Sequence, residues 1–241
     1  MNISRYISKL FYPEKCVFCG RTIPFLDSFC HNCALSECNT PESFCCYCNS
    51  QKCHCEKTDR RLRHITAPYI YTNAAKEIII SLKFRKKKHY SSLLSEGIVR
   101  KVIEDFSDVS FDFVTFVPTS DKVKSQRGYN QSELIALNVA DRLFLPCVDA
   151  LIKTKDTAHQ HYLSAEMRQK NLSDAISVKP DVDIKGKTVL VCDDIKTTGS
   201  TLLVCEELLL TSGASDVYCA VAAIPIFGKA NIGIDKTDKK I

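Results

Sequence analysis

The fold and the candidate site of this chain are indicated most clearly by residues 189–201, Val-Leu-Val-Cys-Asp-Asp-Ile-Lys-Thr-Thr-Gly-Ser-Thr. Apolar residues from Val189 to Cys192 predict a short buried strand, and two adjacent acids, Asp193 and Asp194, follow it. A hydroxyl-rich turn around one glycine comes next, and an apolar-periodic helix begins after it. This order is typical of a site for a phosphorylated sugar, because carboxylates accept hydrogen bonds from sugar hydroxyls and a helix N-terminus offers N–H groups to phosphate.

A simpler interpretation is that the two acids only cap the following helix, as in an ordinary strand–helix loop. Two features favour phosphate binding over capping alone. The turn carries more hydroxyl groups than one cap needs, and Gly199 allows the backbone to approach a ligand closely. The predicted binding residues are therefore Asp193, Asp194, Thr197, Thr198, Gly199, Ser200 and Thr201.

Length and composition place the chain among globular proteins. Its 241 residues suffice for one large or two small domains, and 45% of them are hydrophobic and 25% charged. The net charge of +5 permits binding to polyphosphates or nucleic acid without requiring it. The apolar runs are too short to span a bilayer, and residues 1–12 lack the long apolar core of a signal peptide. We therefore expect a cytoplasmic protein without membrane insertion.

Cysteine usage divides the chain in two. Ten of the fourteen cysteines lie between residues 16 and 55, and in a cytoplasmic protein such a cluster is better explained by metal than by disulfides. The others stand in apolar surroundings and are expected to be buried packing residues: Cys147, Cys192, Cys205 and Cys219.

The clustered cysteines predict a small zinc-binding module over residues 1–57. A Cys-x2-Cys pair lets two thiolates from one tight turn reach the same ion, and two pairs complete a structural zinc site. Adjacent pairs can share an ion or the pairs can interleave, His31 or His54 can substitute as a ligand, and the shorter last spacing leaves one or two ions open. The module has few aliphatic residues, so its fold is expected to depend on the metal. The predicted ligands are Cys16, Cys19, Cys30, Cys33, Cys45, Cys48, Cys53 and Cys55.

Strands and helices are predicted to alternate downstream of this module, after a polar linker over residues 56–66. Such alternation predicts an α/β domain, over residues 65–230, with a mainly parallel sheet flanked by helices. A polar, lysine-rich tail follows from residue 226. The expected strands lie near 67–71, 111–117, 187–192 and 216–223, and the expected helices over 73–88, 90–106, after 131 and up to 211.

Two polar loops are expected to complete the site at the carboxyl ends of the strands, where open α/β sheets bind ligands. The first, residues 118–131, is basic, and Arg127-Gly128 beside a helix start suits a second phosphate group. The second, residues 153–172, is almost devoid of aliphatic residues, which in a compact domain is typical of a lid or binding loop. The predicted lid residues are Gln160, Arg168 and Asn171.

A run of cations stands at the end of the first predicted helix, with five positive charges in the six positions 83–88. It suits a nucleic-acid backbone, and Phe84 and Tyr90 nearby could stack on bases. The alternative is a solvated helix end whose cations are favoured by the helix dipole, with the aromatic residues in the core. The sequence supports the two about equally. The candidate DNA-binding residues are Lys83, Arg85, Lys86, Lys87 and Lys88.

Residues 189–201 resemble the 5-phosphoribosyl-1-pyrophosphate (PRPP) motif of type I phosphoribosyltransferases. The rest of the chain narrows the resemblance to the ComF family of competence-associated, amidophosphoribosyltransferase-like proteins. It implies a type I phosphoribosyltransferase fold preceded by a Cys-rich zinc-binding module. The resemblance rests on the cysteine pairs, Leu82-Lys83-Phe84, Arg127-Gly128-Tyr129-Asn130-Gln131 and Gln160-x2-Leu163-Ser164-x3-Arg168-x2-Asn171-Leu172. Cys53-x-Cys55 and Ala175-Ile176 depart from the usual pattern of the family.

The resemblance implies roles for the site residues. Asp193 and Asp194 are expected to bind the ribose 2′- and 3′-hydroxyls, residues 197–201 the 5′-phosphate, and Arg127 the pyrophosphate. Mg²⁺ is expected to be held mostly by PRPP and water. No nucleobase pocket or catalytic base is recognisable, so catalysis itself is not assigned.

The same resemblance implies a cytoplasmic role in natural transformation, in handling incoming single-stranded DNA. Expected partners are PRPP, single-stranded DNA and proteins of DNA uptake or recombination. Two hypotheses stay open at this point. One is an active phosphoribosyltransferase with an unknown acceptor, and the other is a non-catalytic DNA-binding or adaptor module.

Overall fold

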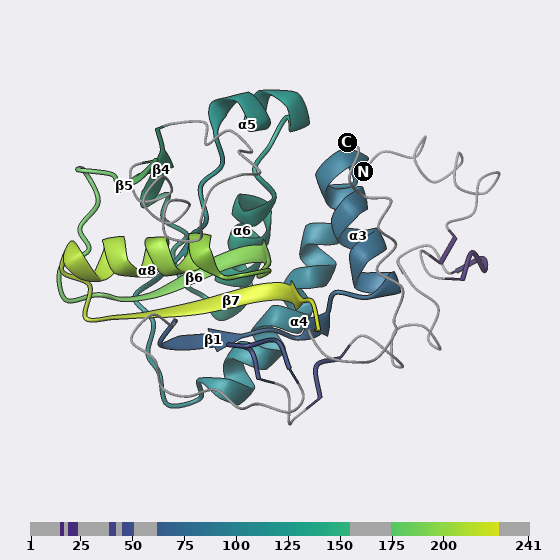
Figure 1. Cartoon of the computed structure of the whole chain (residues 1–241), viewed down its shortest axis with the longest axis horizontal. Helices are drawn as coiled ribbons and strands as arrows, with labels where there is room; N and C mark the ends of the chain where they lie inside the picture. The colour runs from purple at the N-terminus through teal and green to yellow at the C-terminus, as the bar shows by residue number, and fades with distance from the viewer. Residues whose placement is uncertain are drawn as a thin grey trace.

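Groups of strands and groups of helices follow each other in turn along the described part of the chain, as expected for an α/β domain (Figure 1). The structure, a computed structural model, describes residues 15–16, 19–23, 39–41, 45–50, 62–154 and 175–226. Its elements are β1 (His64–Thr66), β2 (Tyr69–Ile70), α3 (Asn73–Phe84), α4 (Tyr90–Asp105), β3 (Phe113–Phe116), α5 (Asp121–Arg127), α6 (Gln131–Leu143), β4 (Leu151–Lys153), β5 (Ile176–Val178), β6 (Thr188–Ile195), α8 (Ser200–Thr211) and β7 (Asp216–Ile224).

The main sheet is parallel, which confirms the expected class of fold. Its strands lie in the order β1-β7-β6-β3, and β2 pairs with the end of β7 beyond β1. Phe116 of β3 is opposite Cys192 of β6, which is opposite Ala220 of β7. Because the strands are parallel, their carboxyl ends lie along one edge, and the loops that follow β3 and β6 meet there.

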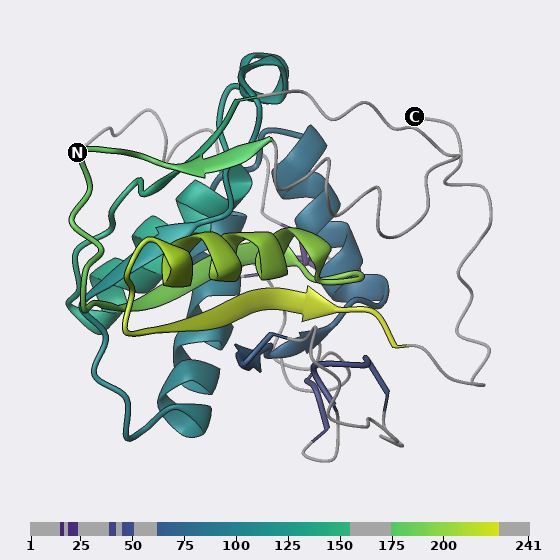
Figure 2. The same ribbon diagram turned by 60° about the vertical axis from the view of Figure 1, so that its left-hand side comes forward.

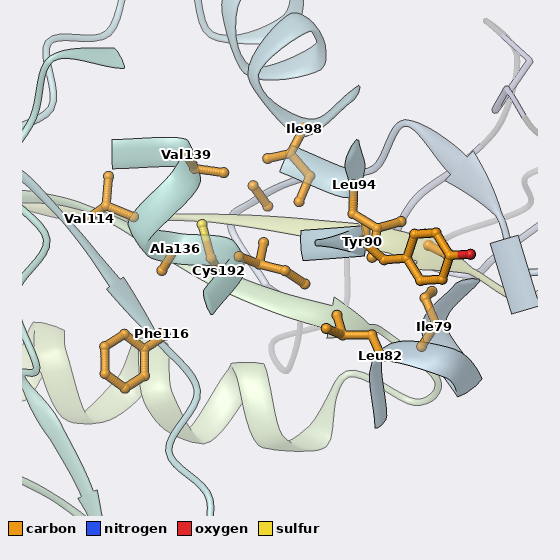
Figure 3. Packing of buried hydrophobic residues seen from close by; sticks show 14 of the residues in the cluster. Ile79, Leu82, Tyr90, Leu94, Ile98, Val114, Phe116, Ala136, Val139 and Cys192 are labelled. Carbon is orange, nitrogen blue, oxygen red and sulfur yellow. The ribbon is translucent and has the colours of Figure 1, made fainter. Parts of the chain in front are cut away.

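Alternate residues of the central strands supply two hydrophobic cores, one on each face of the sheet. Val189 and Val191 of β6 pack on the face covered by α8, whereas Leu190 and Cys192 pack on the opposite face. That opposite face is covered by α3, α4 and α6, so Figures 1 and 2 show helices on both sides of the sheet. Figure 3 shows the second core, in which Ile98 of α4 lies among the side chains that pack against this face of β3 and β6.

The first edge of the sheet differs from the prediction in two ways. The expected strand near 67–71 is two short strands, β1 and β2, separated by Ala67 and Pro68. A proline has no N–H to give to a ladder, which fits the break at that point. The expected linker also ends earlier, because Leu62 is buried and His64–Thr66 pairs with β7.

Helix α3 ends at Phe84, four residues before the predicted end. The backbone leaves the helix at Arg85, and Lys86 adopts a positive φ of 56°. The cations at 85–88 therefore lie in an exposed turn between α3 and α4. Arg85 is the C-cap of α3, where the helix dipole favours a cation, whereas the cations at 86–88 lie beyond the helix, where that effect is weaker.

The polar segment 118–131, expected to be a loop, contains helix α5. Ser120 caps it by accepting a hydrogen bond from the backbone N–H of Val123, and Gly128 ends it in the left-handed conformation at φ 81°. No residue of α5 is buried. A helix that buries nothing shows no apolar periodicity, so the sequence carries no hydropathy signal for α5.

The ends of the predicted lid lie side by side. Strands β4 and β5 form an antiparallel pair that the sequence analysis missed, and Thr154 donates its backbone N–H to the carbonyl of Ala175 at 2.8 Å. The predicted lid residues between them, Gln160, Arg168 and Asn171, lie outside the described residues.

Within the described residues, none of the helices is both long enough and apolar enough to cross a membrane.

Candidate functional site

Asp193 and Asp194 lie within strand β6, close to its carboxyl end, rather than after it. The strand was expected to end at Cys192, but it continues to Ile195, because Asp193 and Ile195 stay in register with Val221 and Ala223 of β7. The acids are thereby fixed by backbone pairing at the carboxyl end of the sheet. Two neighbouring helices bring further side chains to them, Ser132 from α6 and Lys83 from α3.

Asp193 is held by two short hydrogen bonds to the same oxygen. Its Oδ1 accepts from the Ser132 hydroxyl at 2.6 Å and from the backbone N–H of Asp194 at 2.8 Å. Burial, reinforced by the negative charge of Asp194, raises the pKa of Asp193 to about 7, and the Ser132 hydrogen bond opposes that rise. Ser132 was not among the predicted site residues, although it directly follows the quoted Arg127–Gln131 motif.

Asp194 forms an ion pair with Lys83. Asp194 is 6% exposed, and the Lys83 Nζ atom lies 2.9 Å from its Oδ2. Lys83 comes from the last turn of α3, so this pair ties that helix to β6. The sequence analysis grouped Lys83 with the cations proposed to bind DNA, whereas the structure places its ammonium at the acids.

The predicted phosphate loop leads from β6 into α8. Gly199 has φ 83° immediately before Ser200, the first residue of α8, and this left-handed conformation favours glycine. The hydroxyl oxygens of Thr198 and Ser200 lie 3.0 Å apart, while Thr197 is exposed and Thr201 lies in the first turn of the helix. The loop therefore sets hydroxyls and helix N–H groups beside the two acids, as the sequence predicts for a phosphate.

Arg127 is the last residue of α5 and Gly128 its C-cap, in the segment that joins the neighbouring strand β3 to α6. The Arg127 Nη1 donates to Oε1 of Gln131 at 2.9 Å, and the Arg127 guanidinium lies over the Phe84 ring at 4.9 Å. Gln131 is buried, and its Nε2 makes no hydrogen bond with any of the described residues. A buried donor without a partner is costly and marks a place where a polar ligand could supply the acceptor.

The turn between α3 and α4 exposes cations beside aromatic rings. Phe84 is 60% exposed, Lys87 lies over the Tyr90 ring at 5.7 Å and Lys88 over the Tyr129 ring at 4.9 Å. We call this the basic–aromatic turn and define it as residues 84–88 with Arg127. Arg127 links this turn to the acids. It donates a hydrogen bond to Gln131, and the next residue, Ser132, donates one to Asp193.

Two described cysteine pairs lie on turns of the same geometry. In one, Cys16 donates its N–H to the carbonyl of Arg21 and accepts from the N–H of Gly20. In the other, Cys45 donates its N–H to the carbonyl of Ser50 and accepts from the N–H of Asn49. Gly20 and Asn49 both have positive φ, at 70° and 58°. Each turn places two thiols three residues apart on a closed loop, which fits a pair of zinc ligands.

The zinc prediction goes no further than these turns. Among the residues that the structure describes, no group of three or more His, Cys, Asp and Glu side chains is placed to hold a metal ion. The other predicted ligands, Cys30, Cys33, Cys53 and Cys55, lie outside the described residues.

The cysteines expected to be packing residues are mostly buried, and burial raises their thiol pKa values. The pKa of Cys147, which is half-buried, rises to about 11. Cys46 lies in the cysteine cluster but is not one of the eight predicted zinc ligands. It packs against the domain core, and burial raises its pKa to about 11. Its thiol therefore stays protonated at neutral pH.

Glu206 is a buried acid of α8 outside the candidate site. Its Oε1 accepts the backbone N–H of Arg63 at 2.9 Å, and burial raises its pKa to about 7. A folded protein that keeps this proton up to pH 7, where an unfolded glutamate loses it near pH 4.5, loses stability as the pH rises through that window. Above pH 7 the loss is complete.

Glu206→Gln is therefore expected to be more stable than the wild type by about 1–2 kcal/mol at pH 8 and equally stable at pH 4. The amide oxygen keeps the Arg63 hydrogen bond and removes the ionisable group. Urea unfolding at several pH values measures the effect, with Glu207→Gln, an exposed neighbour, as the matched control. Equal pH slopes in wild type and Glu206→Gln would exclude Glu206 as the titrating group.

This sheet and its acid–hydroxyl loop define the class of the protein. Residues 130–240 match the model of the phosphoribosyl transferase domain. The parallel sheet flanked by helices, with that match, is a type I phosphoribosyltransferase fold. The matched segment includes Ser132, both acids and the phosphate loop.

The curated relatives share one printed name, DNA utilization protein YhgH. The Escherichia coli (strain K12) protein is 27% identical over 153 residues, which cover 61% of this chain and 66% of the relative. The Salmonella typhi protein is 26% identical over the same length. The chain thus matches slightly less than two thirds of these relatives.

Solved structures with related folds are more distant. Glutamine PRPP amidotransferase from B. subtilis has a TM-score of 0.38 at 21% identity, over 55% of this chain and 26% of that chain. An adenine phosphoribosyltransferase has a TM-score of 0.41 at 16% identity, over 59% of this chain and 74% of that chain.

Proposed function

We propose that this chain binds PRPP together with Mg²⁺ at the acid pair and the phosphate loop. The observation that carries the proposal is the placement of Asp193 and Asp194 at the carboxyl end of β6, directly before a loop that enters α8 through Gly199. Adjacent carboxylates match a ribose diol, and hydroxyls with helix N–H groups match its 5′-phosphate. The two subsites are joined by only a few residues of one loop.

The neighbouring residues support this ligand. Lys83 pairs with Asp194 and Ser132 orients Asp193, so both acids are positioned to accept hydroxyl hydrogen bonds. The carboxylates also suit Mg²⁺, which binds oxygen ligands and retains several waters, so that it neutralises charge on the diphosphate when bound. Arg127 at the end of α5, with the Gln131 Nε2 beside it, supports a pyrophosphate subsite next to the acids.

A calorimetric titration with PRPP and Mg²⁺ tests the proposal. We expect saturable binding with one site per chain that requires the divalent ion. A following assay for pyrophosphate release with candidate acceptors separates an active transferase from a protein that only binds PRPP. The absence of heat and of any thermal stabilisation by PRPP would contradict the proposed function.

We further propose that the protein acts in DNA utilisation and that the basic–aromatic turn binds single-stranded DNA. The printed name of the relatives supports the role, and the geometry of the turn supports the ligand. Exposed Phe84 under the Arg127 guanidinium offers a face for a base, and the exposed cations at 85–88 can follow a phosphate backbone. Proteins of DNA uptake or recombination and a cytoplasmic site of action belong to the same proposal.

DNA binding is tested by fluorescence anisotropy with a labelled oligonucleotide at several salt concentrations. A variant with Lys86, Lys87 and Lys88 changed to glutamine is expected to show a lower salt slope, because each lost phosphate contact reduces counterion release. The matched control changes three exposed cations away from this turn, Arg100, Lys122 and Lys185. Equal slopes in both triple variants would contradict this surface.

Structural zinc in the cysteine-rich segment is also a proposal. It is supported by the matching turns at Cys16 and Cys45, and elemental analysis of the purified protein distinguishes one ion from two or none.

A further inference from the structure

Lys196 is a buried lysine at the start of the phosphate loop, directly after β6. It is 3% exposed, and its Nζ donates to the backbone carbonyl of Tyr47 at 2.8 Å and to Oδ1 of Asn49 at 2.6 Å. Both acceptors belong to the cysteine turn 45–50. A lysine is seldom fully buried unless its ammonium is paired, so these contacts fix the side chain in one place.

Asn49 completes a closed ring of hydrogen bonds with the loop. Its Nδ2 donates to the backbone carbonyl of Thr197 at 3.0 Å, while its Oδ1 accepts from Lys196. One amide therefore holds two consecutive residues of the phosphate loop. Asn49 is 1% exposed and has φ 58°, a conformation that asparagine tolerates better than most residues.

The lysine chain also lies against the point where the loop turns into α8. A Cβ atom placed on Gly199 would be 3.0 Å from Cε of Lys196, so the methylene groups of this lysine fill the space behind Gly199. The backbone N–H of Lys196 donates to the carbonyl of Ala223 in β7. The loop is thus fixed from the sheet by its backbone and from the cysteine turn by its side chain.

The cysteine turn itself is anchored to the domain. Cys46 packs against the hydrophobic core, and the Tyr47 hydroxyl donates to the backbone carbonyl of Arg63 at 2.6 Å. The cysteine turn therefore has a fixed position relative to the domain, independently of its contacts with Lys196.

We propose that Lys196 and Asn49 are positioning residues of the PRPP site, through which the cysteine turn 45–50 holds the phosphate loop in its binding conformation. The ligand in this inference rests on the proposed function, whereas the clasp between turn and loop does not. The clasp restricts residues 196–199 before ligand arrives, so less conformational entropy is lost on binding.

The experiment compares Lys196→Met, Asn49→Gly and the double variant with the wild type. Methionine keeps the apolar length behind Gly199 but donates nothing, and glycine keeps the positive φ of residue 49, as Gly20 does in the equivalent turn. Lys185→Met, in an exposed loop, is the matched control. Amide hydrogen exchange of a peptide covering residues 196–202 is measured without ligand, and PRPP affinity is measured by calorimetry with Mg²⁺.

Each single variant is expected to exchange about tenfold faster over residues 196–202 and to bind PRPP about tenfold more weakly. The double variant is expected to resemble the single variants, because either change opens the same clasp. If Lys196→Met does not fold, Asn49→Gly decides alone. Unchanged exchange in a folded Asn49→Gly protein would overturn the inference. Faster exchange in a chain whose wild type binds no PRPP would support the clasp and reject only the proposed ligand.

Discussion

Asp193→Asn is expected to weaken PRPP binding at least about a hundredfold and at the same time to stabilise the ligand-free protein at pH 8. The loss follows from the charge-assisted hydrogen bonds to a diol, each contributing about 1.5–3 kcal/mol, two of which amount to a hundredfold or more. The gain follows because the pKa of Asp193 is raised to about 7, so the folded protein holds a buried charge at pH 8 that an amide avoids.

The sign of the stability change depends on pH. An acid whose pKa rises on folding binds more protons in the folded state, so wild-type stability falls between about pH 4 and pH 7 and levels off above it. We expect Asp193→Asn to exceed the wild type by about 1–2 kcal/mol at pH 8, with the difference vanishing near pH 4. The asparagine oxygen keeps the hydrogen bonds from Ser132 and from the N–H of Asp194.

Urea unfolding from pH 4 to pH 8 and calorimetry with PRPP and Mg²⁺ measure the two effects. Asp183→Asn, an exposed acid before β6, is the matched control and should change neither. Adding Asp194→Asn is expected to abolish the remaining PRPP binding. If Asp193→Asn binds PRPP as tightly as the wild type, the ribose diol does not bind to this pair of acids, whatever the stability of the variant.

The quoted stretch could be interpreted from the sequence because its signals are local. A buried strand, two acids, a hydroxyl-rich turn and a helix follow each other within 189–201, and the structure has them in that order. The limits of the elements were less accurate. The acids look like the start of a loop, yet β7 pairs with the backbone at Asp193 and Ile195 and extends the strand through them. Backbone pairing does not depend on side-chain polarity, so hydropathy could not place this limit.

Residues that reach the site from distant positions left no such signal. Ser132 is 61 residues from Asp193, and Asn49 is 147 residues from Lys196. Lys83 stood within a run of like charges, where every member looks equally solvated, and only the end of α3 at Phe84 separates it from the exposed cations. A single sequence carries the residue types but not these pairings, because each pairing is created by the packing of two elements.

The ion pair between Lys83 and Asp194 gives the second large effect. Lys83→Met is expected to destabilise the protein by about 2–4 kcal/mol at pH 8, since it leaves a carboxylate that is 6% exposed without its cation. PRPP binding is expected to weaken about tenfold or more, because the site then carries an additional net negative charge toward a polyphosphate.

A double-mutant cycle separates this pair from a general loss of packing. Adding Asp194→Asn to Lys83→Met removes the unpaired charge, so most of the lost stability should return while PRPP binding does not. Lys86→Met, an exposed cation two residues beyond the end of α3, is the matched control and should leave stability unchanged. If Asp194→Asn fails to rescue Lys83→Met, then methionine disturbs the packing of α3, and loss of the 2.9 Å ion pair is not the cause of the lost stability. Rescue of stability without rescue of binding would instead assign the Asp194 carboxylate to the ligand and Lys83 to pairing with it in the ligand-free protein.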